Sequence, residues 1–126
     1  EKIKKAILFS LSQIDSPKAF NKLKDVALNG KEIKIRKQAI FWIGQSHNKD
    51  ALDILKKIMA GDAPLKIKES ALFAISQQNG KESVDILIDV IKNNKDAKLK
   101  KKAIFWLGQS KDPRAADVIE EILNEK

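Results

Sequence analysis

The sequence predicts an all-α fold, an α-solenoid of four antiparallel helical hairpins, and two columns of identical residues support this prediction. Glutamine recurs every 32 residues, at Gln13, Gln45, Gln77 and Gln109. Phenylalanine recurs at the same interval, at Phe9, Phe41, Phe73 and Phe105. A fixed period of this length is typical of stacked repeats, in which each unit packs mainly on its neighbours and the array presents extended surfaces.

The last repeat shows most clearly how each repeat becomes a pair of helices. Its first half carries an apolar stripe at helical spacing, formed by Leu99, Ala103, Ile104 and Leu107. Its second half carries another, formed by Ala115, Val118, Ile119, Ile122 and Leu123. Gly108 and the polar run after it separate the helices. Asp112 supplies an N-cap, and Pro113 stands at the first position of the second helix.

Similar signals mark the other helices in order. Ser16 followed by Pro17 begins the second helix of the first repeat. Second helices end in glycine or asparagine, at Gly30, Gly61 and the pair Asn93 and Asn94. We expect helices at 2–13, 17–29, 34–45, 49–60, 66–77, 81–93, 98–109 and 113–124. The repeats then span about 1–32, 33–64, 65–96 and 97–126, within one domain.

Composition excludes several classes of site. The chain has no cysteine and one histidine, His47, which excludes a disulfide framework, a histidine metal cluster and a cysteine nucleophile. No apolar run approaches the roughly 18 residues that span a membrane. We expect no cofactor and no metal, and the cellular location stays open. Because the chain begins at Glu1 and in register with the repeat, we expect a piece of a longer protein.

The run from Asp96 to Leu123 resembles the HEAT-like repeat that also occurs in phycobilin lyases. The resemblance rests on Leu99-Lys100, Ala103-Ile104-Phe105-Trp106-Leu107-Gly108, Asp112-Pro113-Arg114-Ala115 and Ile122-Leu123. It extends over the whole chain and is weakest in the first repeat, where Lys22 replaces the apolar residue seen as Ile54, Ile86 and Val118. The resemblance implies a right-handed superhelix with first helices on the convex side and second helices on the concave side. Most such repeats bind proteins.

One position departs from the family pattern. An arginine commonly follows the first apolar residue of these repeats, but Lys4, Lys68 and Lys100 stand there and only Arg36 keeps it. Lysine lacks the planar guanidinium fork, so bidentate pairing with a neighbouring aspartate is not expected in those three repeats.

A longer period of two repeats accompanies the first. Repeats two and four carry Phe-Trp-Ile-Gly and Phe-Trp-Leu-Gly at 41–44 and 105–108, whereas repeats one and three carry Phe-Ser-Leu-Ser and Phe-Ala-Ile-Ser at 9–12 and 73–76. Because close-packed interfaces need complementary volumes, we expect each tryptophan to cover a space left by Ser10 or Ala74 on an adjacent hairpin. The alternative is that Trp42 and Trp106 are exposed binding anchors.

The repeated phenylalanine predicts an aromatic feature on the convex side. On a helical wheel Phe9 points away from the face shared by Ile3, Ile7 and Leu11. The four equivalent rings would form a discontinuous, partly exposed phenylalanine ridge, made of Phe9, Phe41, Phe73 and Phe105. The alternative is that lysine stems and adjacent helices cover the rings.

The first helices carry most of the positive charge. Their segments contain 12 Lys and Arg against one acid, Glu69, whereas the whole chain has a net charge of +8. Lysines at the same end of every first helix predict a lysine rail along one edge, formed by Lys2, Lys34, Lys66 and Lys98. Such a rail can attract nucleic acid or an anionic surface, or it can serve solubility alone.

The second helices present the predicted partner-binding surface. Helical-wheel positions on their exposed side are Asp53, Lys56, Lys57, Asp85, Ile88, Asp89, Asp117, Glu120 and Glu121. The surface becomes acidic toward the C-terminal end, with Ile88 as an apolar spot, and this composition suits a basic segment of a partner.

We therefore expect a noncatalytic scaffold that binds another protein on its concave surface and is itself a monomer. The alternative is a polyanion binder, for nucleic acid or an anionic surface, that uses the lysine rail. The aspartates of the concave surface lie on separate helices and suggest no acid–base pair, so the sequence marks no catalytic pocket.

Overall fold

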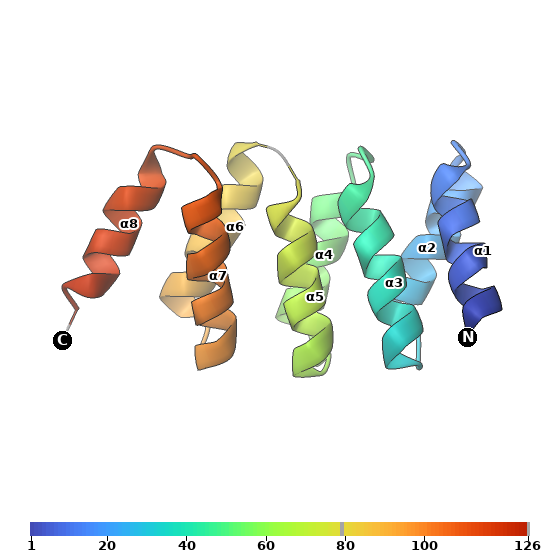
Figure 1. The fold of residues 1–126 in the computed structure, drawn as a ribbon, viewed down its shortest axis with the longest axis horizontal. Helices are drawn as coiled ribbons and strands as arrows, with labels where there is room; N and C mark the ends of the chain where they lie inside the picture. Colours follow the sequence, from blue (N-terminus) through green and yellow to red (C-terminus); the bar gives the residue numbers. More distant parts are fainter. Residues whose placement is uncertain (79, 126) are drawn as a thin grey trace.

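The computed structural model describes residues 1–78 and 80–125. Within these residues the chain forms eight α-helices: α1 (Lys2–Gln13), α2 (Pro17–Asn29), α3 (Ile33–Gln45), α4 (Ala51–Ala60), α5 (Leu65–Ser76), α6 (Lys81–Asn93), α7 (Ala97–Gln109) and α8 (Arg114–Leu123). The first helices α1, α3, α5 and α7 stand side by side in one row, and α2, α4 and α6 lie behind them (Figure 1). The predicted α-solenoid of helical hairpins is confirmed. The expected end of the last repeat, residue 126, lies outside the described residues.

The helix bounds follow the predicted ones closely. Helices α1, α2 and α6 have the predicted bounds, and the others begin or end within two residues of them. The largest difference is at α4, which begins at Ala51, because Asn48 and Asp50 form a turn before it. The Asn48 side chain accepts a hydrogen bond from the Asp50 amide at 2.8 Å, and its carbonyl accepts one from Ala51 at 3.1 Å.

Side-chain caps begin three of the helices. The Ser16 hydroxyl accepts a hydrogen bond from the Ala19 amide at 3.1 Å, and Asp96 accepts one from the Lys98 amide at 2.9 Å. Asp112 accepts one from the Arg114 amide at 2.8 Å, as its position before Pro113 predicts. These bonds satisfy amides that have no partner within the helix, so the caps fix where the chain turns from one helix into the next.

The hydrophobic core lies between the two rows and continues from one hairpin to the next. Its fully buried large side chains gather in the two central hairpins, with Ile40, Ile43, Leu55, Ile67, Leu72, Ile75 and Leu87 among them. Among the described residues, α1 buries only Leu8 and α8 buries only Val118. A hairpin therefore gains most of its burial from neighbours on both sides, as expected for a repeat array.

Helices α3 and α5 approach each other closely because a glycine faces an alanine. A Cβ atom built on Gly44 would lie 2.6 Å from the Cβ of Ala74 and 2.9 Å from its Cα. The equivalent residue of α7 is Gly108, where an added Cβ would meet nothing within 4 Å. The same residue type is thus required by packing in one repeat and unconstrained in another.

The tryptophans pack between hairpins, as expected from the two-repeat period. Trp42 meets the ring of Phe9 edge to face at a centroid distance of 5.2 Å, and Trp106 meets Phe73 in the same way at 5.2 Å. Both indoles are partly buried against the core. The facing group is the phenylalanine of the preceding repeat, while Ala74 is matched by Gly44. Both tryptophans therefore pack between hairpins and are not exposed binding anchors.

The two glycines provide a matched test of this packing. We expect Gly44→Ala to lower the free energy of unfolding by about 1–3 kcal/mol, because the new methyl group overpacks the contact with Ala74. We expect Gly108→Ala to raise it by up to about 1 kcal/mol, because alanine favours the helix and nothing opposes its methyl group. Urea denaturation of both variants measures the two changes, and equal changes would contradict the close approach.

Candidate partner-binding groove

A groove of about 660 Å³ lies between α4 and α6 on the second-helix side of the array. These two helices do not pack along each other as α3 and α5 do. The groove is lined by Lys56, Met59, Ala60, Glu82, Asp85, Ile86, Asp89, Val90, Asn93 and Asn94. The groove exists because the first helices α3 and α5 pack closely while the second helices α4 and α6 pack more loosely.

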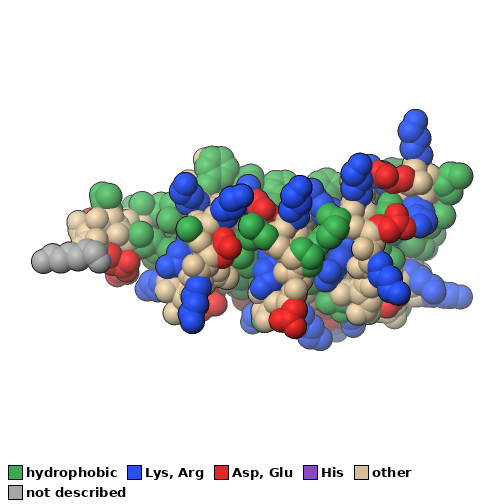
Figure 2. All heavy atoms as spheres, turned by 90° about the horizontal axis from the view of Figure 1, so that it is seen from below, with side chains coloured by type: hydrophobic (Ala, Val, Ile, Leu, Met, Phe, Trp, Pro, Cys, Tyr) green, Lys and Arg blue, Asp and Glu red, His purple; other side chains and the backbone are tan. Residues whose placement is uncertain are grey.

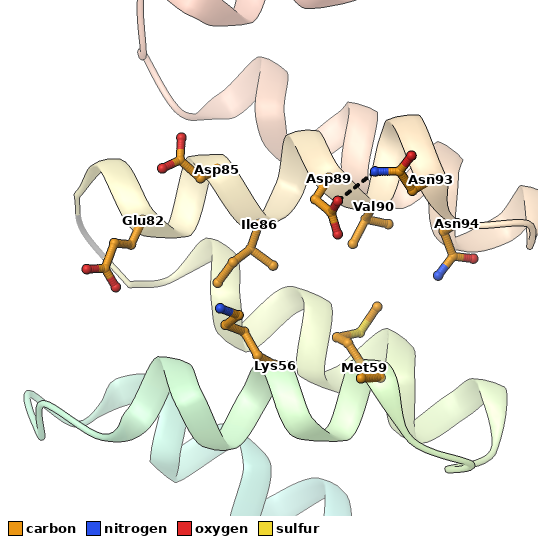
Figure 3. Close-up of a pocket in the computed structure, with 10 residues that line it drawn as sticks. Lys56, Met59, Glu82, Asp85, Ile86, Asp89, Val90, Asn93 and Asn94 are labelled. Carbon is orange, nitrogen blue, oxygen red and sulfur yellow. Dashed lines mark hydrogen bonds between the residues drawn. The ribbon is translucent and has the colours of Figure 1, made fainter.

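The groove combines an apolar strip with an acidic edge. Figure 3 shows Met59 directed from α4 toward α6, and Ile86 and Val90 directed from α6 toward α4. The acidic edge belongs to α6 and consists of Glu82, Asp85 and Asp89. Lys56 is the one cation among the lining residues. An apolar strip with carboxylates on one side suits an apolar side chain that is flanked by basic ones.

The groove gathers three of the nine predicted partner-binding residues: Lys56, Asp85 and Asp89. The charged members outside it are exposed on α4 and on α8: Asp53 and Lys57 on α4, and Asp117, Glu120 and Glu121 on α8. The expected apolar spot Ile88 is partly buried against the core and does not line the groove. Its place is taken by Ile86, which the sequence aligns with the buried Ile54 and Val118. Ile86 opens into the groove because α4 and α6 stand apart.

Ion pairs between α6 and α8 engage part of the predicted acidic surface. Arg114 pairs with Asp85, and its guanidinium also donates to Asp112 at 3.1 and 3.2 Å. Lys92 pairs with Glu121 at 3.6 Å. Asp85 and Glu121 therefore hold the last hairpin against the third. Within the groove, Glu82 and Asp89 are the carboxylates that these inter-hairpin bonds do not engage.

The contacts of Arg114 also shift acid–base equilibria. The hydrogen bond from the Arg114 side chain lowers the pKa of Asp112 below its ordinary value. The hydrogen bonds that Arg114 donates to the carboxylates of Asp112 and then Asp85 raise the pKa of Arg114. This pairing uses the bidentate guanidinium fork that lysine lacks.

Arg36 uses its guanidinium differently. It donates hydrogen bonds to the carbonyls of Ala27 at 2.8 Å and Leu28 at 3.1 Å and so caps the C-terminal end of α2.

The lysine rail lies on the edge where the first helices begin. Its members Lys2, Lys34, Lys66 and Lys98 are all exposed. Figure 2 looks onto this edge and shows many Lys and Arg side chains interspersed with acidic and apolar ones. Nearby lysines are partly neutralised, since Lys4 pairs with Glu32, Lys5 with Glu1 at 3.4 Å and Lys102 with Glu69 at 3.2 Å. Hydrogen bonding to Lys4 lowers the pKa of Glu32.

The phenylalanine ridge is continuous, and this corrects the expected discontinuous row. Phe9, Phe41 and Phe105 are 48%, 37% and 56% exposed, whereas Phe73 is partly buried. Phe41 stacks on Phe73 at 6.5 Å with nearly parallel rings, and the tryptophans fill the other gaps. The rings are therefore packed against neighbouring aromatic rings on one side and open to solvent on the other. The expected partial exposure and the expected cover by adjacent helices both hold in part.

Metal clusters and membrane-spanning helices are absent from the described residues. No group of three or more histidine, cysteine or acidic side chains there could hold a metal ion. None of the helices described is long and apolar enough to cross a membrane. His47 is exposed in the segment between α3 and α4.

Stacked helical hairpins with an open second-helix face define a helical-repeat protein. The chain belongs to the HEAT repeat family, because the family model for HEAT repeats matches residues 52–126. This match confirms the resemblance seen in the sequence. HEAT repeats typically are noncatalytic scaffolds that mediate protein interactions. No curated protein and no solved structure matches the chain.

The contacts of Arg114 predict an acid-sensitive difference in stability. The carboxylate of Asp112 has a lowered pKa, so its contribution to stability is present above the ordinary value of 3.8 and is lost as the pH falls through the lower folded value. We expect Arg114→Ala to have a lower urea unfolding midpoint than the original chain at pH 7. Near pH 2 the two midpoints should differ much less, because Asp112 is then protonated in both chains. Lys95→Ala removes an exposed cation from the loop between α6 and α7 and is the control, whose urea midpoint should match that of the original chain at both pH values. A difference of equal size at both pH values would contradict the prediction.

Proposed function

We propose that this chain is a noncatalytic protein-interaction scaffold whose partner docks in the groove between α4 and α6. The observation that carries the proposal is the groove itself, in which an apolar strip runs beside carboxylates that no inter-hairpin bond engages. Membership of the HEAT repeat family supports the general role. The groove is a narrower candidate surface than the whole second-helix side.

The chemistry of the groove defines the partner segment. Met59, Ile86 and Val90 suit one or two apolar side chains, because burial of a full aliphatic side chain contributes about 1.5–3 kcal/mol. Glu82 and Asp89 suit lysine or arginine on the same side of the segment. Asp89 accepts a hydrogen bond from Asn93 at 2.7 Å, and a carboxylate has further acceptor capacity for a cation. We infer a short segment in which basic residues flank an apolar one.

Selection from a random peptide library tests this proposal and does not require the partner to be identified first. The chain is used to enrich peptides, and the affinity of the enriched ones is then measured for the original chain and for two groove variants. We expect enriched sequences with an apolar residue beside lysine or arginine. We expect Asp89→Lys and Ile86→Ser to weaken their binding by about tenfold or more, a loss of about 1.4 kcal/mol or more.

Asp53→Lys is the matched control, because it reverses a charge on the same face but outside the groove. It should leave the affinity within about twofold, since an exposed charge at this distance is largely screened. Enriched peptides that bind both groove variants as tightly as the original chain would show that the groove is not the docking site.

The second candidate is a polyanion binder, and the exposure of all four lysines of the rail favours it. Binding of duplex DNA, RNA or heparin through the rail must weaken steeply with salt, with a slope near 0.9 per phosphate neutralised on duplex DNA. Fluorescence anisotropy at two salt concentrations measures this slope. We expect Lys34→Glu with Lys66→Glu to abolish such binding and Lys57→Glu, on the second-helix side, to retain it. No binding in low salt would exclude this function.

A further inference from the structure

The two ends of the array expose apolar side chains at positions that are buried inside it. At the N-terminal end Ile3 is 76% exposed, whereas its equivalent two repeats along, Ile67, is fully buried. At the C-terminal end Ile104 is only partly buried, whereas its equivalent Ile40 is fully buried. The exposed residues at the two ends are thus of the same apolar type as those that pack between hairpins inside the array.

The two-repeat period makes the two ends complementary to each other. Repeats two and four share Phe-Trp-x-Gly, so α7 and α8 repeat the surface that α3 and α4 present to the third hairpin. The first repeat resembles the third, so α1 and α2 repeat the surface that receives it. Gly108 corresponds to Gly44 and Ser10 corresponds to Ala74. Gly44 and Ala74 touch, whereas Gly108 has an open side and Ser10 is exposed.

We propose that a second copy of this chain covers each end, with α7 and α8 of one copy packed on α1 and α2 of the next. The copies stack head to tail in the register of the internal contact between the second and third hairpins. In this register Gly108 meets Ser10 of the next copy, as Gly44 meets Ala74. Phe105 stacks on Phe9 of the next copy, as Phe41 stacks on Phe73.

Charges on the second helices fit the same register. Asp85 and Arg114 form an ion pair between the third and fourth hairpins. At the proposed junction their equivalent positions hold Asp117 of one copy and Lys18 of the next, and both are exposed. By the same equivalence α8 presents Asp117 and Glu120 to the next copy, and α2 of that copy presents Lys18 and Lys22 together with one acid, Asp25. Complementary charge of this kind favours the head-to-tail orientation over other pairings.

Two substitutions make the junction weaker than the internal contact it repeats. Ile7 stands where Ala71 is fully buried, and the larger side chain needs additional room. Lys5 stands where Glu69 lies in the third repeat, which adds a like charge close to Lys101. We therefore expect association at high protein concentration. The monomer expected from the sequence is the alternative outcome of the measurement that follows.

Because the contact joins two different surfaces, it leaves one end open after each addition and gives a row of copies unless the rotation closes a ring. Sedimentation equilibrium from the micromolar to the millimolar range, at moderate salt, measures the assembly. We expect the mean mass to rise past that of a dimer without reaching a plateau at two copies. A mass of one copy throughout would overturn the proposal and would leave the ends to a further hairpin of a longer chain.

Two variants that each block one end distinguish head-to-tail stacking from a symmetric dimer. Gly108→Leu fills the C-terminal contact, and its own chain has space for the side chain. Ile3→Lys places a charge on the N-terminal contact at a position that is already exposed. We expect each variant alone to remain a monomer and an equimolar mixture to form a 1:1 dimer and nothing larger, because each variant keeps the end that the other lacks.

Gln109→Leu is the matched control for Gly108→Leu. Its equivalent inside the array, Gln45, is exposed, so a leucine beside the contact should leave assembly unchanged. Circular dichroism confirms that each variant folds. Self-association of either end variant on its own, or a mixture that stays monomeric, would overturn the head-to-tail arrangement.

Discussion

The contact of Gly44 with Ala74 is the constraint on which the central part of the molecule depends. It brings α3 and α5 together, so the core continues from the second hairpin into the third, and most of the fully buried large side chains lie in these two hairpins. Each hairpin is a pair of helices, and close approach in the first-helix row leaves α4 and α6 apart on the other side. The groove between them is therefore a consequence of packing at a position that lines neither wall. A small residue in one row determines an open surface in the other.

Aromatic residues fill the contacts that do not have a glycine facing an alanine. Trp42 and Trp106 each bridge a phenylalanine of their own repeat and one of the preceding repeat, at centroid distances of 4.8–5.2 Å. Edge-to-face pairs of this kind contribute about 0.5–1.5 kcal/mol beyond burial. The indole nitrogen of Trp42 is buried without a hydrogen-bond partner among the described residues, which costs about 1–3 kcal/mol. The large indole ring of Trp42 therefore fills the contact between hairpins, while its nitrogen is left without a hydrogen bond. Repeats with a tryptophan at this position alternate with repeats that have serine or alanine there.

The fold could be predicted from sequence because its signals are local. Apolar stripes, the caps at Ser16 and Asp112 and the helix-ending glycines each act within one or two turns, and the 32-residue period repeats them. The groove could be predicted only in part, because a helical wheel shows which side of one helix is exposed but not how far the next helix stands from it. The wheel therefore places Ile86 in the core and Ile88 on the surface. The pairing of Arg114 with Asp85 joins residues 29 positions apart, and no local pattern indicates it.

The distribution of charge separates the two candidate modes of binding in physical terms. The chain has a net charge of +8, yet the groove places three carboxylates against one lysine. At physiological ionic strength the Debye length is about 8 Å, so a cationic segment within the groove interacts mainly with Glu82 and Asp89, while the distant lysine rail is screened. At low ionic strength the same segment first meets the repulsion of the whole protein. Added salt therefore weakens a long-range repulsion as well as a short-range attraction, so we expect binding at the proposed groove site to change little with salt. A polyanion on the rail experiences attraction at every distance, and salt can only weaken it.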